Sequence, residues 1–282
     1  MKILVIGGTQ FIGRYLSLEF IKLGHEVVLF HKNKSHQPDE IGVQHIIGDR
    51  RLPAEPRLTE KFDLLVDTCA YEPSDLDILS YIEFQRYLFI STVAVYSPAI
   101  PEGCAEDAQR IDGVGFGVEA RGYGLLKKYT EDLVSELFPS AAIVRPAVVL
   151  GPRDNSRRLE RIYEDFVRGQ TLFAPVSSDS SLVTQFIDVR DLTKLIIEII
   201  SKNMTGAFNL VGKTVGWNDF LKTFSTVAEI GLSNAESDSF PLWDTTKSRG
   251  LRTLQSSHDF VRNFEFTKLE DSLRDWFSEY QK

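Results

Sequence analysis

The chain has 282 residues, of which 43% are hydrophobic and 26% are charged, and its formal net charge is -8 at pH 7. These values are ordinary for a globular protein of one large domain, or of a large and a small one. The acidic balance disfavours general nucleic-acid binding, which needs clustered Lys and Arg, and no apolar run reaches the roughly 18 residues that cross a bilayer.

Cysteine and histidine usage limits the chemistry further. The chain has 2 cysteines, Cys69 and Cys104, too few for a disulfide framework or a zinc set, and its 5 histidines show no metal-ligand spacing with carboxylates. The first apolar run stops at a glycine pair after residue 6, too early for the core of a signal peptide. We therefore expect a cytoplasmic protein without a metal site or a membrane anchor.

Short runs rich in Val, Ile and Leu alternate with amphipathic stretches up to residue 150. This alternation is typical of a parallel α/β sheet, and runs that are apolar throughout suit strands buried on both faces. We therefore predict a Rossmann-type, doubly wound parallel sheet in this part. The predicted strands are Ile3–Ile6, Glu26–Phe30, Asp63–Asp67, Tyr87–Ser91 and Ala142–Val149, and the predicted helix is Tyr123–Leu137.

The first predicted strand runs directly into a glycine turn and a helix start, with the sequence GGTQFIGR at residues 7–14. Glycines permit a tight turn, and the helix N-terminus offers free N–H groups and a positive dipole end to a pyrophosphate. Gln10 stands where the usual dinucleotide pattern has a glycine, and a plain strand-to-helix turn is the alternative. The predicted phosphate-binding residues are Gly7, Gly8, Thr9, Gln10, Phe11, Ile12 and Gly13.

The end of the second strand carries no carboxylate for a ribose 2'-hydroxyl. It reads His31, Lys32, Asn33, Lys34, and the two lysines favour NADP over NAD because they can pair with a 2'-phosphate. A solvated basic loop is the alternative. After the next short run, Asp49 puts a carboxylate near the expected place of an adenine amino group, although a surface turn explains it equally well.

Hydroxyl groups follow the fourth strand, and a Tyr/Lys pair follows on the next helix. Thr92 lies at the carboxyl end of the strand, where ligands bind in open α/β sheets, so it can hold a substrate oxygen. Tyr123 and Lys127 are spaced i and i+4, which puts both on one face of a helix. The Lys charge would stabilise a Tyr phenolate, although a solvated helix face also explains such spacing.

Beyond residue 150 the regularity weakens. The predicted elements are a strand at Gln185–Val189, a helix at Leu192–Ile200, a strand at Gly206–Val211 and a last helix at Leu269–Tyr280. We expect residues 1–150 to form an NAD(P)-binding Rossmann domain to which residues 183–205 return. We expect residues 151–182 and 206–282 to form a smaller α/β substrate-binding part.

Taken together, these motifs resemble the NAD-dependent epimerase/dehydratase family of extended short-chain dehydrogenases/reductases, over nearly the whole chain. Residues 206–212 and 241–243 also resemble a bacterial subgroup described as reductases or epimerase-like proteins. The motifs that carry the family resemblance are GGTQFIGR at 7–14, STVAVY at 91–96, Tyr123 to Lys127, RP at 145–146, GPRD at 151–154 and FIDVRDL at 186–192.

The resemblance implies a role for each matching residue. Tyr123 would be the acid/base, Lys127 would hold the nicotinamide ribose and tune Tyr123, and Thr92 would orient the substrate. It also puts further residues against an NAD(P) cofactor. Those are Asp49 and Arg50 by the adenine, Cys69, Ala70 and Tyr71 over the cofactor, and Pro146 to Val148 near the nicotinamide amide.

Two functions remain open at this stage. The first is an NAD(P)-dependent oxidoreductase or epimerase/dehydratase acting on a nucleotide sugar or a smaller hydroxyl or carbonyl compound, the latter because the second part is short. The second is a non-catalytic dinucleotide-sensing or RNA-binding protein, because the opening motif also resembles chloroplast stem-loop RNA-binding relatives. An arginine-rich stretch from Arg153 to Arg168 is the best basic cluster, but interspersed acids favour a paired helix face. The family resemblance also implies a homodimer.

Overall fold

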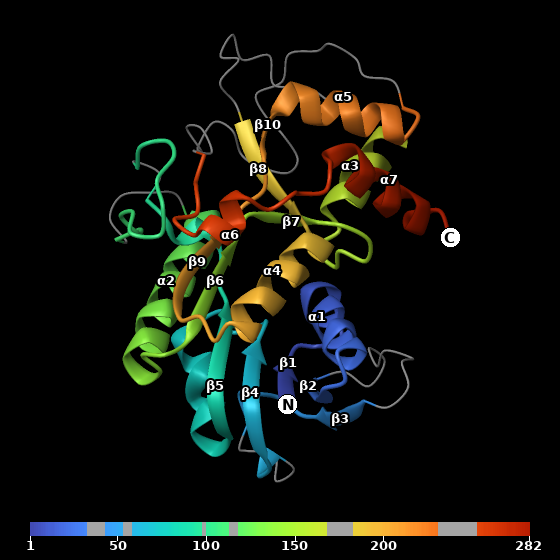
Figure 1. Ribbon diagram of the computed structural model, residues 1–282. Helices are drawn as coiled ribbons and strands as arrows, with labels where there is room; N and C mark the ends of the chain where they lie inside the picture. Colours follow the sequence, from blue (N-terminus) through green and yellow to red (C-terminus); the bar gives the residue numbers. More distant parts are fainter. Residues whose placement is uncertain (33–42, 53–57, 98–99, 113–117, 168–182, 231–252) are drawn as a thin grey trace.

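The computed structural model describes residues 1–32, 43–52, 58–97, 100–112, 118–167, 183–230 and 253–282. Lys34 lies outside these ranges. The described ranges contain a large parallel sheet, a small second sheet and the helices that cover them (Figure 1).

The large sheet has seven strands in the order β3-β2-β1-β4-β5-β6-β9, and all neighbouring strands are parallel. The chain starts in the middle at β1 and winds outward in both directions, so the predicted Rossmann-type, doubly wound fold is confirmed. The strands are β1 (Lys2–Ile6), β2 (Glu26–His31), β3 (Gln44–Ile47), β4 (Lys61–Asp67), β5 (Glu83–Ile90), β6 (Ala142–Pro146) and β9 (Gly206–Leu210).

Both faces of the large sheet are buried, which explains its uniformly apolar strands. Along β1, Ile3 and Val5 pack into one core and Leu4 and Ile6 into another. The first core is completed by α1 (Phe11–Lys22) and α4 (Val189–Ser201), and the second by the 3-10 helix η3 (Pro73–Tyr81) and α2 (Val118–Leu137). A short 3-10 helix, η4 (Val93–Val95), follows β5 and contacts α2.

The second sheet has the order β10-β8-β7 and lies beyond the carboxyl ends of the large sheet's strands (Figure 1). Its own apolar core includes Phe186, Phe220 and Trp276. The elements of this part are β7 (Val148–Leu150), α3 (Arg158–Val167), β8 (Val183–Asp188), β10 (Thr214–Gly216), α5 (Trp217–Val227) and α7 (Leu269–Tyr280). The short helix α6 (Asp259–Arg262) packs instead on the large sheet, with Val261 in its first core.

One predicted strand was wrong in its extent. The apolar run at 142–149 is two strands, since β6 ends at Pro146 in the large sheet and β7 begins at Val148 in the small one. Ala147 stands between them, and its N–H donates to the Leu210 carbonyl at 3.1 Å. The chain therefore passes from one sheet to the other within a single residue.

The second half of the chain contributes to both sheets. β8 belongs to the small sheet, whereas α4, which follows it directly, packs against α1 on the large sheet. β9 joins the large sheet beside β6, although residues 206–282 were expected in the smaller part. The division of the chain into two domains therefore stays a prediction.

No helix within the described ranges combines the length and the apolar character that a membrane span requires.

Trp276 should be a main support of the small sheet's core. Its ring is 1% exposed and lies 5.7 Å from the Phe224 ring, between centroids. We expect Trp276→Ala to lower the free energy of unfolding by about 3–5 kcal/mol, because the surrounding side chains cannot refill the volume. Urea unfolding followed by circular dichroism would measure it.

Tyr280→Ala is the matched control for that substitution. Tyr280 stacks on Trp276 at 5.4 Å between centroids but is 37% exposed, so its loss should cost less. A loss at Trp276 no larger than that at Tyr280 would contradict the assignment.

Candidate functional site

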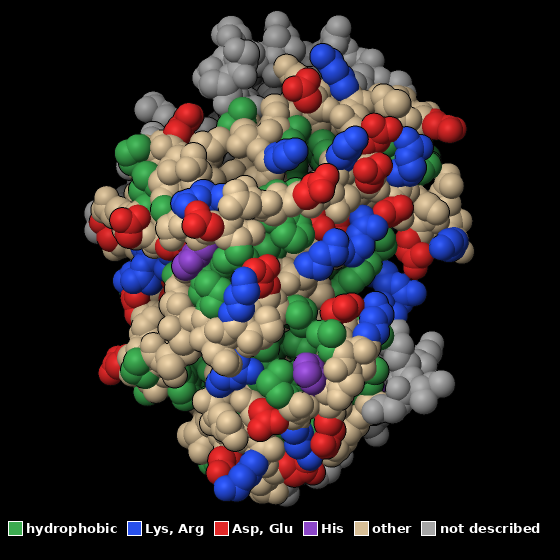
Figure 2. All heavy atoms as spheres, in the orientation of Figure 1, with side chains coloured by type: hydrophobic (Ala, Val, Ile, Leu, Met, Phe, Trp, Pro, Cys, Tyr) green, Lys and Arg blue, Asp and Glu red, His purple; other side chains and the backbone are tan. Residues whose placement is uncertain are grey.

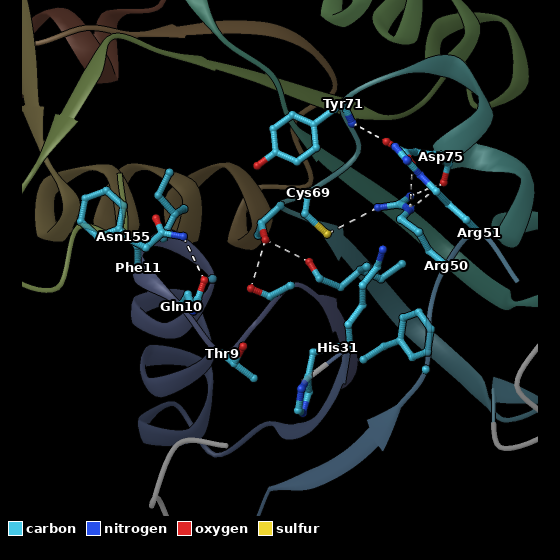
Figure 3. Close-up of a pocket in the computed structure, with 18 residues that line it drawn as sticks. Thr9, Gln10, Phe11, His31, Arg50, Arg51, Cys69, Tyr71, Asp75 and Asn155 are labelled. Carbon is cyan, nitrogen blue, oxygen red and sulfur yellow. Dashed lines mark hydrogen bonds and ion pairs between the residues drawn. The ribbon is translucent and has the colours of Figure 1, made fainter. Parts of the chain in front are cut away.

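A cavity of about 470 Å³ opens at the carboxyl ends of β1, β2 and β4 (Figure 3). This is the edge at which ligands bind in open α/β sheets. Its wall is formed by the glycine turn after β1, the end of β2, the segment after β3, the loop after β4 and one residue of the loop after β7. The lining residues are Ile6, Gly7, Thr9, Gln10, Phe11, Ile12, Gly13, Phe30, His31, Lys32, Gly48, Arg50, Arg51, Thr68, Cys69, Tyr71, Asp75 and Asn155.

The glycine turn and the start of α1 form a cradle at one end of the cavity. A Cβ atom added to Gly13 would lie 2.3 Å from the Gly7 carbonyl oxygen, so no side chain fits between the turn and α1. The first bond inside α1 runs from the Arg14 N–H to the Gln10 carbonyl, at 3.1 Å. The earlier N–H groups of the helix therefore have no intrahelical acceptor and can serve an anion.

The far end of the cavity is lined by the residues that follow β2. The His31 and His45 rings share a hydrogen bond of 2.8 Å, between Nε2 and Nδ1. The Lys32 ammonium pairs with the Asp49 carboxylate at 3.0 Å. The Arg51 N–H, together with Lys32, lowers the pKa of Asp49. Lys32, one of the two lysines expected to meet a 2'-phosphate, is therefore already paired with a carboxylate.

Arg50 is buried beneath the cavity instead of reaching across it. Its guanidinium donates two hydrogen bonds to the Asp67 carboxylate, at 2.9 and 2.7 Å, and its Nε donates to the Asp75 carbonyl at 2.8 Å. Arg50 and Asp67 are 5% and 0% exposed. The pair fixes the segment after β3 to the end of β4, so we assign the Arg50 side chain to building this wall.

Lys127 is the second buried cation of the site. Its ammonium donates hydrogen bonds of 2.7 Å to the carbonyls of Ala70 and Ile90, at the carboxyl ends of β4 and β5. It also lies 4.5 Å from the centroid of the Phe89 ring and 5.3 Å from that of Tyr71. Burial lowers the pKa of this ammonium to about 8.

Tyr123 lies one helical turn before Lys127, and its hydroxyl hydrogen-bonds to the side chain of Thr92. Gly124 permits this arrangement, because a Cβ there would lie 2.2 Å from the Ala94 carbonyl oxygen. Although 39% of Tyr123 is exposed, neighbouring atoms desolvate its hydroxyl, and this burial raises the pKa of Tyr123 to about 12. The phenol therefore keeps its proton at neutral pH.

Tyr71 connects the Tyr/Lys pair to the cavity. Its ring lines the cavity, lies 6.2 Å from the Tyr123 ring between centroids, and faces the Lys127 ammonium. Thr92, Tyr123 and Lys127 do not themselves line the cavity. They lie at its end beyond Tyr71, and the structure thus brings the two groups of predicted site residues together.

The predicted cofactor-binding residues fall into two sets. Those that line the cavity are Gly7, Thr9, Gln10, Phe11, Ile12, Gly13, His31, Lys32, Arg50, Cys69 and Tyr71. Those described but absent from its lining are Gly8, Asp49, Ala70, Pro146 and Val148.

Four polar lining residues escaped sequence reasoning, namely Arg51, Thr68, Asp75 and Asn155. Asp75 accepts hydrogen bonds from the Arg51 guanidinium at 2.9 Å and from the Tyr71 N–H at 2.8 Å. The position of Asp75 in the first turn of η3 was the only local signal. Asn155 donates to the Gln10 side chain at 2.9 Å, and a contact between residues so far apart in sequence leaves no local pattern.

Residues 73–210 match the sequence model of the NAD dependent epimerase/dehydratase family. Over 234 residues the chain is 26% identical to the chloroplast stem-loop binding protein of 41 kDa b of Arabidopsis thaliana, covering 75% of this chain and 59% of that protein. The chain thus spans less than two thirds of this curated relative.

Two solved structures share the fold over the full length of the chain. UDP-glucuronic acid 4-epimerase from Bacillus cereus, in complex with NAD, is 18% identical with a TM-score of 0.78, covering 100% of this chain and 97% of that one. The Bordetella bronchiseptica enzyme WbmH, in complex with NAD+, is 15% identical with a TM-score of 0.77, covering 100% and 98%.

The lowered pKa of Lys127 has a consequence for stability. Between about pH 8 and pH 10.5 the unfolded chain binds this proton and the folded chain does not, so folding gains free energy as the pH rises. Relative to Lys127→Met, the wild type should gain about 3 kcal/mol in free energy of unfolding across this range. Urea unfolding of both proteins at pH 7 and pH 10.5 would test it.

Lys128→Met, one residue along α2 and partly exposed, is the matched control. Relative to Lys128→Met, the wild type should show no such gain in free energy of unfolding. A gain relative to Lys128→Met, with none relative to Lys127→Met, would contradict the assignment of Lys127 as the buried ammonium.

Proposed function

We propose that the chain is a member of the NAD-dependent epimerase/dehydratase family, whose sequence model residues 73–210 match, and that Tyr123 exchanges a proton with a hydroxyl or carbonyl oxygen of a nucleotide sugar. The observation that carries this proposal is the buried Lys127 ammonium, fixed by two backbone carbonyls one helical turn from Tyr123. A buried cation is costly to keep, which favours a role for it in the site. The cavity beyond Tyr71 supplies room for a dinucleotide next to this pair.

The described residues fit a dinucleotide in two respects. The glycine turn packs closely on α1, because Gly13 has no side chain, and the start of α1 borders the cavity beside it. From there the cavity extends to His31 and Lys32, where the adenosine end would lie. We propose that residues 7–13 hold the pyrophosphate and that Asp49 faces the adenine. The ends of β6 and β7, at Pro146 and Val148, would flank the nicotinamide amide.

Tyr123 would donate its proton to a carbonyl oxygen of the substrate in the direction in which the cofactor gives a hydride to the carbonyl carbon. With a pKa of about 12 the phenol is protonated at neutral pH, and Thr92, hydrogen-bonded to it, would hold the substrate oxygen in line. A positive charge close to the phenol would stabilise the phenolate left after transfer, and we propose Lys127, one helical turn along α2, for this role. The nicotinamide of a bound cofactor would supply the matching hydride chemistry.

A nucleotide sugar suits the size of the second part. The alignment with the Bacillus cereus 4-epimerase covers 100% of this chain and 97% of that one, so the shared fold extends through the second part. This favours a nucleotide sugar over a smaller hydroxyl or carbonyl compound. We therefore propose a nucleotide sugar as the substrate, and we leave the choice between epimerisation, dehydration and net oxidation to the turnover measurement.

Binding of RNA is not favoured by the arginine-rich segment. Arg153 pairs with Glu279 at 3.3 Å, Arg157 pairs with Glu164, and Arg158 lies 3.7 Å from Asp154. Figure 2 shows Lys and Arg side chains interspersed with Asp and Glu over this face. Phosphate binding needs cations in excess, so the neighbouring acids oppose it.

We also propose a cytoplasmic location and a homodimer. Cys69 and Cys104 are both free thiols, which suits a reducing compartment.

On α2, Leu126, Tyr129 and Leu137 are exposed and spaced to share one face, which a second copy of the chain could cover. Analytical ultracentrifugation would measure the oligomeric state.

Tyr123→Phe should separate chemistry from binding. The substitution removes the hydroxyl but leaves the ring, so we expect kcat on a panel of UDP-sugars to fall by about 10²- to 10⁴-fold while the NADH dissociation constant is nearly unchanged. Tyr129→Phe, on an exposed part of the same helix, is the matched control. Equal turnover by both variants would contradict the proposed proton donor.

Cofactor preference gives a separate test. Because Lys32 is already paired with Asp49, we propose NAD as the cofactor in place of the NADP expected from Lys32 and Lys34. We expect NADP to bind no more tightly than NAD, and Lys32→Ala to change the ratio of the two dissociation constants by less than about 3-fold. Tighter NADP binding that Lys32→Ala abolishes would restore the expectation from the sequence.

A further inference from the structure

A hydrogen bond at the edge of the cavity joins two parts of the chain that are far apart in sequence. The Asn155 amide donates from Nδ2 to Oε1 of Gln10 at 2.9 Å. Gln10 stands at the start of α1, on the large sheet, and Asn155 lies in the loop between β7 and α3, on the small one. Both residues line the cavity, and Figure 3 shows them meeting on the side of the glycine turn.

The loop that carries Asn155 is held on both sides. The buried Asp154 carboxylate, 3% exposed, accepts hydrogen bonds from the Ser156 N–H at 2.9 Å and from its hydroxyl at 2.6 Å. On the other side, the Arg153 guanidinium reaches Glu279 of α7 at 3.3 Å. The Asn155 side chain is therefore presented by the small-sheet part, independently of the glycine turn.

Gln10 is held in an equally defined way on the side of the large sheet. It is the N-cap residue of α1, in an extended conformation with φ -130° and ψ 148°, and its side chain makes no capping bond to the helix. Its carbonyl accepts the first N–H bond of α1, so the backbone cannot move without disturbing the helix. The side chain instead turns to Asn155. This contact also shows how the turn accommodates a long side chain where a glycine is usual.

We propose that Gln10 and Asn155 form a clasp that slows release of the dinucleotide from this cavity. The inference rests on the proposed function, since it takes the cavity as the dinucleotide site. The clasp joins the rim of the pyrophosphate cradle to the small-sheet part. A dinucleotide bound in the cradle would pass this rim when it dissociates, so the hydrogen bond between Gln10 and Asn155 has to break first. Asn155 is then a positioning residue that acts through Gln10.

The size of the effect follows from the kind of bond. A hydrogen bond between two neutral amides makes a small net contribution, equivalent to a change of about 2- to 10-fold in a rate. Because the hydrogen bond has to break before the dinucleotide can leave, removing this bond should accelerate release about 2- to 10-fold. Its loss should leave the folded structure intact, since the bond lies on the surface.

The experiment uses the full chain loaded with NADH and chased with excess NAD+, with release followed by stopped-flow NADH fluorescence. Asn155→Leu and Gln10→Leu each remove one partner while keeping a side chain of similar size. We expect each to release NADH about 2- to 10-fold faster than wild type. The double variant should release it no faster than the faster single variant, because both remove the same bond.

Two further variants sharpen the test. The swap of Gln10→Asn with Asn155→Gln keeps two amides at the same sites and should return release towards the wild-type rate. Asn218→Leu, at an exposed asparagine of α5 that does not line the cavity, is the matched control and should release NADH at the wild-type rate.

The outcomes separate this inference from the proposed function. Unchanged release in both single variants, with NADH still bound, would overturn the clasp and leave the dinucleotide site standing. Additive acceleration in the double variant would also overturn it, because two independent contacts would then be involved. If wild type binds no NADH at millimolar concentration, the proposed function and the clasp fall together.

Discussion

The position of one ammonium group governs much of the site. Lys127 can be buried only if its proton donors are satisfied, and the carbonyls of Ala70 and Ile90 do this from the ends of two neighbouring strands. The bonds are short enough that α2 must lie close to the sheet. Gly124 makes that approach sterically possible, since any side chain there would strike the Ala94 carbonyl. Tyr123 is brought to Thr92 by the same constraint.

Two buried ion pairs fix segments that border the site. Arg50 and Asp67 join the segment after β3 to the end of β4. Arg145 of β6 makes a second pair with Glu131 of α2, its Nη2 donating at 2.7 Å, and also donates to the Tyr96 hydroxyl at 2.7 Å. Such pairs contribute little net stability compared with apolar side chains, but each fixes the direction of the groups that it joins. Here both fix loops and helices that border the site.

The large sheet could be predicted because its strands are buried on both faces, which leaves continuous apolar runs such as Ile3–Ile6 in the sequence. β3 could not, because only Ile46 of its four residues is fully buried. The division between β6 and β7 was equally hidden. Apart from Arg145, Ala142–Val149 is apolar on both sides of the break, and hydropathy does not record which sheet accepts its hydrogen bonds.

The candidate site divides in the same way. The glycine turn and the Tyr/Lys pair are local patterns, and short-range geometry sets their spacing, so sequence alone could single them out. The partners of Arg50 and Lys32 are carboxylates on other segments, and only the fold determines whether a cation meets a ligand or an acid. Asn155 is the extreme case, because the sheet switch at Ala147 is what carries its loop across to Gln10. Of the two residues of the proposed clasp, Asn155 is therefore supplied by the part of the chain with the least regular sequence pattern.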